Sequence, residues 1–189
     1  MKKFKRLGSM LISGILLIGL IGCGSQKPSA VVTEYLNEVK KGDTGRSNEL
    51  LKGSMEESEK ELAAVDDYSE EITKLLSDSL KKLDFKINNE TINGDKAVVN
   101  VTINGDNISM AMTEAIMKSF GLLFESAFTN PDMSEEESNK IMNDAMIESF
   151  KNVTLDERTG DLTLTKVDKE WTLESDDELY KLVLGEVKE

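Results

Sequence analysis

The side chains that could perform chemistry in this chain are few. Cys23 is the only cysteine, and it follows Leu20-Ile21-Gly22 at the end of an apolar run. The chain has no histidine, which removes the commonest general base, the Ser-His-Asp and Cys-His arrangements, and nitrogen-ligated zinc or iron sites. A single cysteine allows no disulfide within the chain. Among the carboxylates, Glu114 and Glu125 are the best catalytic candidates because they lie within apolar runs.

Residues 1–22 have the pattern of a secretory signal peptide. Four basic residues and no acid occur before Leu7, and an apolar run from Leu7 to Ile21 follows. As a helix, this run of about fifteen residues would reach ~22 Å, which is short of a ~30 Å hydrocarbon core. We therefore predict a segment that is cleaved and does not span the membrane.

The end of this segment, Leu20-Ile21-Gly22-Cys23, resembles the lipobox of bacterial lipoproteins. The resemblance implies that the Cys23 thiol receives a diacylglyceryl group, that residues 1–22 are removed, and that Cys23 becomes the mature N-terminus. One acyl chain gives marginal membrane binding, whereas two or more give stable anchoring. The alternative is a buried structural cysteine in an uncleaved helix. We expect a lipid anchor on the extracytoplasmic face of the cell membrane, with residues 23–28 as the lipidated cysteine and a short tether.

The rest of the chain is strongly acidic. The formal charge of the chain is −13, and removal of the four positive charges of residues 1–22 leaves −17. This charge excludes nucleic acid as a partner, because phosphate binding needs a basic surface, and it disfavours a polybasic contact with anionic lipid. Residues 24–28 span at most ~17–18 Å when extended. The domain is therefore expected to lie close to a membrane surface that repels it.

The first part of residues 29–189 predicts helices followed by a β-hairpin. Apolar residues repeat at helical spacing after Ser29, which is a good N-cap. Ser54-Met55-Glu56-Glu57 has the sequence of a capping box and predicts a long amphipathic helix that continues to Leu83. The period then changes to two on both sides of Asn93-Gly94, which is the strongest short-range signal of a hairpin.

Two further helices are predicted within residues 109–149. Ile108 to Phe128 is the densest apolar stretch after the leader, and Ser134-Glu135-Glu136-Glu137 predicts a capped second helix. Six of the nine methionines fall between Met110 and Met146. Methionine-rich helices can form adaptable binding surfaces. The favoured interpretation is that these methionines fill the core between the helices and a sheet.

The C-terminal part predicts strands and one short helix. Strand patterns flank a turn predicted at Thr159-Gly160-Asp161 and end near Trp171, the only tryptophan. Trp171 is expected to pack between sheet and helix, with ligand stacking as the alternative. Ser175-Asp176-Asp177-Glu178 predicts a third capping box, and its helix closes at Gly185.

Two segments resemble certain Gram-positive lipoproteins that carry a domain of unknown function. They are the opening helix from Pro28 to Asp43 and the stretch from Lys169 to Asp176 that precedes a Leu-rich turn and Gly185. This family has a cystatin-like, nuclear-transport-factor-2-like fold. The resemblance implies an α+β domain with N-terminal helices packed on a curved antiparallel sheet of about four or five strands, enclosing a cone that often holds a ligand. Residues 109–149 form a two-helix insertion that could cap, fill or replace the cone. Enzymes of this fold use His, Asp or Tyr in the cone, and no acid here matches a catalytic position.

These patterns predict a non-enzymatic ligand-binding or protein-interaction module without metal or cofactor. Its candidate ligand-binding residues are Met110, Met117, Phe124 and Trp171 together with the sheet face, and its candidate partners are an apolar small molecule or an envelope protein. An enzyme acting through a carboxylate in the cone is one alternative. A structural component of a cell-envelope complex is another. It predicts that the two inserted helices expose an apolar patch larger than a monomer usually tolerates.

Overall fold

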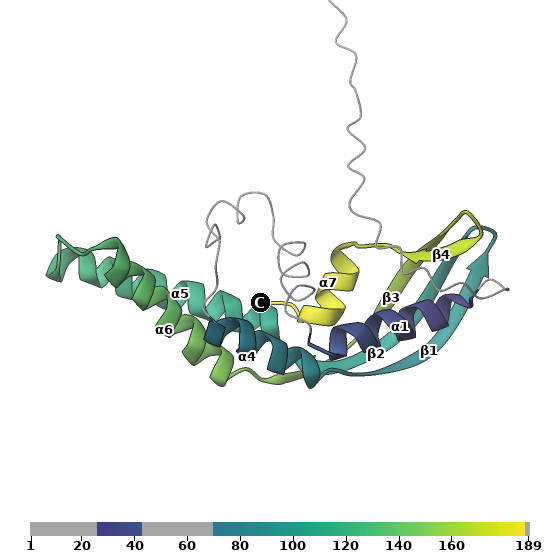
Figure 1. The fold of residues 1–189 in the computed structure, drawn as a ribbon, viewed down its shortest axis with the longest axis horizontal. Coiled ribbons are helices and arrows are strands. Elements are labelled where there is room, and N and C mark those ends of the chain that lie inside the picture. The colour runs from purple at the N-terminus through teal and green to yellow at the C-terminus, as the bar shows by residue number, and fades with distance from the viewer. Residues whose placement is uncertain (1–25, 43–69, 188–189) are drawn as a thin grey trace, which may run out of the picture.

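The computed structural model describes residues 26–42 and 70–187. These residues form five helices and an open four-stranded antiparallel sheet of order β1-β2-β3-β4 (Figure 1). The helices are α1 (Pro28–Lys40), α4 (Glu70–Lys81), α5 (Ile108–Thr129), α6 (Glu135–Lys151) and α7 (Asp177–Leu184). The strands are β1 (Asp84–Asn93), β2 (Lys96–Asp106), β3 (Leu155–Val167) and β4 (Glu170–Leu173). The predicted α+β class, with a two-helix insertion and a short C-terminal helix, is confirmed.

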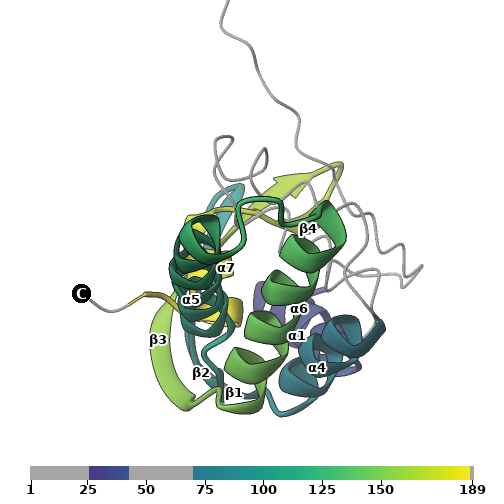
Figure 2. The same cartoon turned by 90° about the vertical axis from the view of Figure 1, so that its left-hand side faces the viewer.

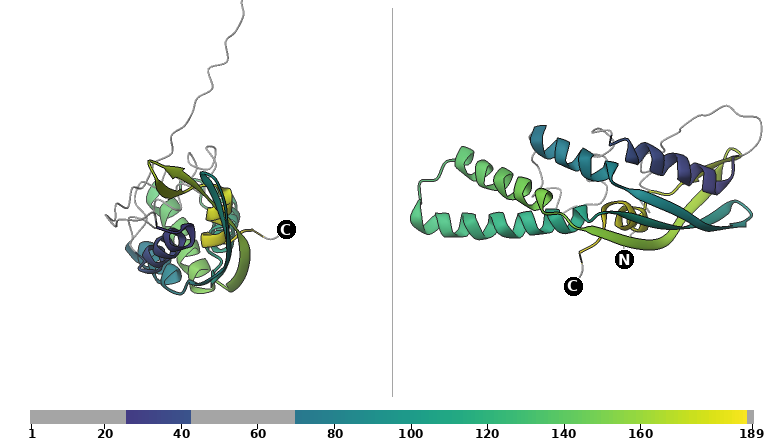
Figure 3. Two further views of the ribbon diagram at one scale, coloured as in Figure 1. Left: turned by 90° about the vertical axis from the view of Figure 1, so that its right-hand side faces the viewer. Right: turned by 90° about the horizontal axis from the view of Figure 1, so that it is seen from below.

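The core lies between the inner face of the curved sheet and helices α1, α4 and α7 (Figure 3). Alternate residues of β2 point into it because side chains of a strand alternate between the two faces of a sheet. Burial is almost complete: Val99 and Val101 of β2 and Leu36 of α1 have no exposed surface. The inner sheet face is therefore covered by the protein's own side chains, and that face offers no open ligand surface.

The outer sheet face is polar. Asn88 Nδ2 of β1 donates to Asn100 Oδ1 and Thr102 Oγ1 of β2, both over 2.9 Å. Thr102 Oγ1 lies 2.8 Å from Thr159 Oγ1 of β3, and Asn100 Nδ2 donates to Asp161 Oδ1 over 2.6 Å. These side-chain bonds link three strands on a face that water can reach, so this face needs no further cover.

The N-terminal end of α1 is fixed against β1. The helix begins at Pro28, which suits the first turn because it has no N–H, and not at an N-cap Ser29 as the sequence predicted. The backbone N–H of Ser29 instead donates to Glu90 Oε2 over 2.9 Å. Hydrogen bonds from Ser29 hold the pKa of Glu90 below its ordinary value. This contact places Gln26, the first described residue, at the β1–β2 turn end of the sheet.

The turn predicted at Thr159-Gly160-Asp161 does not occur, because these residues lie within strand β3. The strand runs unbroken through this segment, and Gly160 pairs with Val101 of β2. A Cβ at Gly160 would meet the carboxylate of Glu178 and would lie 3.2 Å from Leu182 Cδ1, both on α7. The glycine is therefore explained by the close approach of a helix to the sheet, and not by a turn.

Two of the predicted capping boxes can be assessed. Ser134 and Glu137 form one at the start of α6: Glu137 N donates to Ser134 Oγ over 3.2 Å, and Ser134 N donates to Glu137 Oε2 over 2.9 Å. At α7 the N-cap is Asp176, which accepts from Leu179 N over 3.0 Å, so the prediction based on Ser175 was wrong by one residue. The box predicted at Ser54 lies outside the described residues; α4 is described from Glu70.

The two-helix insertion extends past the end of the sheet. Helices α5 and α6 form an antiparallel hairpin that continues the long axis of the molecule away from the β1–β2 turn (Figures 1 and 3). The base of the hairpin joins the core through Ile108, Met112, Met146 and Phe150, whereas its distal half lies outside the space enclosed by the sheet. The N-terminal end of α1 lies at one end of the elongated molecule, and the tip of the α5–α6 hairpin lies at the other (Figure 1).

Candidate interaction surface

Helix α5 carries a row of large apolar side chains that face solvent. Their spacing by about one helical turn places them on one side of the helix. The exposed fractions are 61% for Ile116, 71% for Met117, 71% for Phe120, 61% for Phe124 and 75% for Phe128. We call these five residues the apolar stripe. Ordinary scattered surface apolar residues need no explanation, but a continuous row of this kind does.

The stripe arises because no other described element packs against the distal half of the hairpin. The last buried residue of α5 is Ser119, and the first buried residue of α6 is Ala145. Beyond these two positions, among residues 26–42 and 70–187, each helix is covered only by the other. Seen from the tip, α6 lies between α5 and α4, so α5 is the outer helix (Figure 2). A helix that contacts one neighbour buries one narrow face, and α5 is apolar over a wider arc than that.

The exposed area of the stripe is large for a monomer. If a phenylalanine offers about 200 Å² of apolar surface, the three phenylalanines leave roughly 400 Å² in water. With Ile116 and Met117 the stripe exposes on the order of 600 Å², which is at the upper end of the largest patch on a typical monomer. The rings of Phe124 and Phe128 pack edge to face, with centroids 5.1 Å apart and planes at 73°.

Charge is segregated from the stripe. Lys118 forms an ion pair with Glu148, which ties the side of α5 opposite the stripe to α6. The acids of the hairpin gather at the start of α6, where Glu135, Glu136 and Glu137 occupy the first turn. Hydrogen bonds from Ser134 lower the pKa of Glu137, which lies at the positive end of the helix dipole. The hairpin thus has one apolar side, and its acidic residues gather at its tip.

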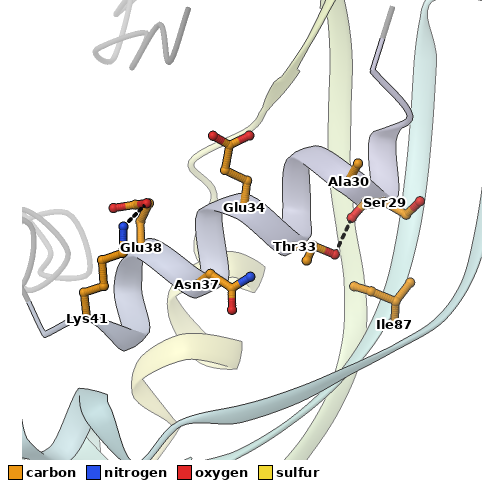
Figure 4. A pocket seen from close by; sticks show the side chains of 8 residues that line it. All are labelled: Ser29, Ala30, Thr33, Glu34, Asn37, Glu38, Lys41 and Ile87. Atoms are coloured by element: carbon orange, nitrogen blue, oxygen red, sulfur yellow. Dashed lines mark hydrogen bonds and ion pairs between the residues drawn. The ribbon is translucent and has the colours of Figure 1, made fainter. Parts of the chain in front are cut away.

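A shallow groove between α1 and β1 is a weaker candidate (Figure 4). Its volume is about 650 Å³, but it is open to solvent, and most of the residues that line it are polar. Several of the polar groups already have partners: Thr33 Oγ1 donates to Ser29 O over 2.7 Å, and Lys41 pairs with Glu38. Small-molecule sites are usually enclosed and mainly apolar, with a few free polar groups. Ile87 is the only large apolar side chain in this lining.

The predicted ligand-binding residues are only partly brought together. Met117 and Phe124 belong to the apolar stripe, and Met110 is half-buried near the base of the same helix. Trp171 lies on β4, toward the opposite end of the molecule from the hairpin tip (Figure 1), and is 9% exposed within the core. Lys166 Nζ lies 5.3 Å from the centroid of its ring. Trp171 therefore does not share a surface with the three α5 residues.

The other predicted chemical groups form no reactive centre in the described part of the chain. Glu114 and Glu125 are both exposed on α5. No group of three or more His, Cys, Asp or Glu side chains that could hold a metal ion occurs among residues 26–42 and 70–187. None of the helices described there is long and apolar enough to cross a membrane. Cys23 lies outside the described residues.

A buried polar junction joins the base of α5 to the C-terminal segment. Arg158 on β3 is 9% exposed; its Nη1 donates to Asp106 O over 3.4 Å, and its Nε and Nη2 have no hydrogen-bond partner within the described structure. Burial lowers the pKa of Arg158, against the effect of the Asp156, Asp106 and Glu186 carboxylates. Lys82 Nζ binds Asp106 Oδ2 over 2.8 Å at the edge of this cluster. The junction fixes the ends of β2, β3 and α7 around the start of α5.

Sequence reasoning missed most of the stripe and all of the junction. Ile116, Phe120 and Phe128 were not among the predicted ligand-binding residues, and the methionines were expected to fill the core. Met112 and Met146 are buried, but Met117 is not. The signal for the junction is the alternation along β3, which places Arg158, Gly160 and Leu162 on the inner face of one strand. It was missed because a turn was predicted at Gly160.

The fold and its surfaces define an α+β domain with a projecting, apolar-sided helical hairpin. The family model described as "Domain of unknown function (DUF4878)" matches residues 21–118, more than half of the chain. The chain therefore belongs to the DUF4878 family. The match begins within the predicted lipobox and ends on α5, at the start of the apolar stripe.

A crystal structure described as that of "a putative lipoprotein (ycdA)" from Bacillus subtilis subsp. subtilis str. 168 is similar to this chain. The two are 19% identical, with a TM-score of 0.42 over 83% of this chain and 47% of that one. This chain thus spans less than half the length of that protein. No curated protein matches the chain.

Proposed function

We propose that this chain is a lipid-anchored, extracytoplasmic protein-interaction module that works without catalysis. The observation that carries the proposal is the apolar stripe on α5. A soluble domain that keeps Phe120, Phe124 and Phe128 in water forgoes the stabilisation that burying them would bring. A partner that covers these rings recovers it, so the stripe supports a binding surface more strongly than any other feature of the described structure.

The geometry of the molecule agrees with an anchor at Cys23. Gln26 is three residues from Cys23 and lies at the end of the molecule where α1 begins. Strand β2 and helix α5 follow one another along the long axis (Figure 1) and together reach up to about 70 Å. A domain held at Gln26 can therefore present the stripe well beyond the lipid headgroups, toward other envelope proteins.

The two alternatives receive less support. An enzyme acting through a carboxylate in the cone needs a shielded acid, and both Glu114 and Glu125 are exposed outside the core. A small-molecule site needs a mainly apolar enclosed pocket, but the inner sheet face is covered, and the α1–β1 groove is open to solvent and lined mainly by polar residues. The stripe is also what a structural component of a cell-envelope complex would show, since such a component is a special case of an interaction module.

Site-specific photocrosslinking in intact cells tests the proposal. A photoreactive phenylalanine analogue at Phe124 is expected to form a protein adduct when the full chain is in its native membrane. The same analogue at Asn139 serves as the matched control, because Asn139 is exposed on α6 of the same hairpin. Protein adducts at Phe124 and few at Asn139 would support the module. Adducts to lipid alone, or equal adducts at both positions, would contradict it.

A further inference from the structure

We propose that a second copy of this chain covers the apolar stripe, with the two α5 helices packed in parallel. The inference rests on the proposed function in taking the stripe as the interaction surface and in placing both copies on one membrane. It goes further by naming the partner, the orientation and the residues of the seam.

The spacing on α5 is that of a two-stranded coiled coil. Residues 110, 113, 117, 120, 124 and 127 alternate in steps of three and four, which places one seam on the helix. They are Met110, Thr113, Met117, Phe120, Phe124 and Ala127. No charged residue occurs in this seam. Ile116 and Phe128 of the apolar stripe flank it, so a parallel copy would meet apolar surface along the full distal half of α5.

The charged residues of α5 do not oppose close packing of the α5 helices of two copies. At about 100° per residue, Lys118 and Glu125 project from the half of the helix that faces away from the seam, while Glu114 lies at its edge, where a parallel copy would offer the uncharged Ser109. Lys118 is already engaged by Glu148 of α6. The acidic first turn of α6 belongs to the other helix of the hairpin. Two copies therefore bring no like charges opposite each other within the seam, although the chain as a whole is acidic.

The area agrees with a dimer of modest stability. Two stripes that cover each other would remove roughly 1,200 Å² in total from water, at the lower end of the range for specific interfaces. A two-fold symmetric contact supplies equal and complementary surfaces without a second gene product. A lipid surface fits less well, because the stripe lies at the far end of the molecule from Gln26 and the hairpin is acidic.

The parallel orientation follows from the anchors. Each copy is expected to be held at Cys23, close to the end where α1 begins. Parallel packing along the long axis keeps both of these ends on one side, so both lipids can enter the same membrane. Antiparallel packing would place the two anchored ends at opposite ends of the dimer.

Thiol crosslinking of the full chain in its membrane tests this inference. Met117→Cys and Phe124→Cys are made separately and treated with a short bis-maleimide, with Asn139→Cys as control. A parallel dimer predicts a product of twice the chain mass from each of the first two variants and little from the control. Adding Phe120→Gln to Met117→Cys should weaken the dimer about 30-fold, as for a central interface aromatic. Adding Ile92→Gln, at the sheet end, should leave it unchanged.

The outcomes separate this inference from the proposed function. The parallel dimer is overturned if no product of twice the chain mass forms. It is also overturned if that product forms only when Met117→Cys and Phe128→Cys chains are mixed, because that pairing indicates antiparallel helices. Crosslinked products of other masses from Phe124→Cys would also overturn the parallel dimer. They would still support the proposed interaction module, because they would show a different protein at the stripe. Crosslinking of the unsubstituted chain through a free Cys23 thiol would instead contradict the lipid anchor.

Discussion

Replacing Cys23 with alanine is expected to abolish lipid attachment completely. The substitution removes the only thiol in the chain, and a thioether cannot form without it. Incorporation of labelled fatty acid should fall to background, and the precursor should keep residues 1–22, because the resemblance to a lipobox implies that processing depends on Cys23. The domain would then be released or mislocalised, since its net charge of −17 gives it no attraction to anionic lipid.

The control for Cys23→Ala is Ser25→Ala, which changes a neighbouring small residue and leaves the thiol. It should label and process like the unsubstituted chain. Gel mobility and fatty-acid label are measured on the same samples. Normal processing of Cys23→Ala, or label that persists in it, would contradict the anchor and with it the placement of the domain on the membrane.

Gly185→Ala is expected to destabilise the fold by about 3 kcal/mol or more, for two reasons that add. Gly185 has a φ of +91°, a conformation that costs other residues about 1–3 kcal/mol. A Cβ there would also lie 2.6 Å from Arg158 Nη1 and closer still to Asn107 Oδ1. Overpacking of this kind costs about 1–3 kcal/mol.

The clash would spread to α5 because Asn107 caps that helix. Asn107 Oδ1 accepts from Met110 N over 3.0 Å, and its Nδ2 donates to Glu186 O over 2.9 Å. Thermal unfolding followed by circular dichroism should show a midpoint lower by roughly 10 °C. Gly94→Ala is the matched control: its φ is +63°, but nothing lies within 4 Å of the added Cβ. That variant should lose about 1 kcal/mol. Equal losses of unfolding free energy in the two variants would show that the contacts of Gly185 with Asn107 and Arg158 add nothing to the effect of the substitution.

The parts of the fold that were predicted correctly are those specified by neighbouring residues. The turn at Asn93-Gly94 needs a positive φ at the glycine, which is +63°, and the hairpin signal lies entirely within that segment. The Ser134 capping box is likewise complete within four residues. The parts that were wrong depend on residues distant in the chain. Gly160 looked like a turn residue because a sequence cannot show that α7 approaches it.

The candidate site was predicted in part for the same reason. Met117 and Phe124 were assigned to a ligand surface from their spacing alone, and they are exposed on one face of α5. Whether this face of α5 is buried or exposed depends on whether the sheet extends far enough to cover it. No local sequence pattern gives the length of the sheet. Trp171 was grouped with them by residue type, although the strand pairing of β4 with β3 holds it in the core.

The central claim is that the apolar stripe is covered by protein in the native membrane. The most direct measurement is the rate at which a membrane-impermeant maleimide labels single cysteines of the full chain in intact cells. Phe124→Cys should react about tenfold or more slowly than Asn139→Cys. Dilution of the purified chain should bring the two rates together as partners dissociate. Equal rates in intact cells would contradict the claim, because they would leave Phe124 facing water where the protein works.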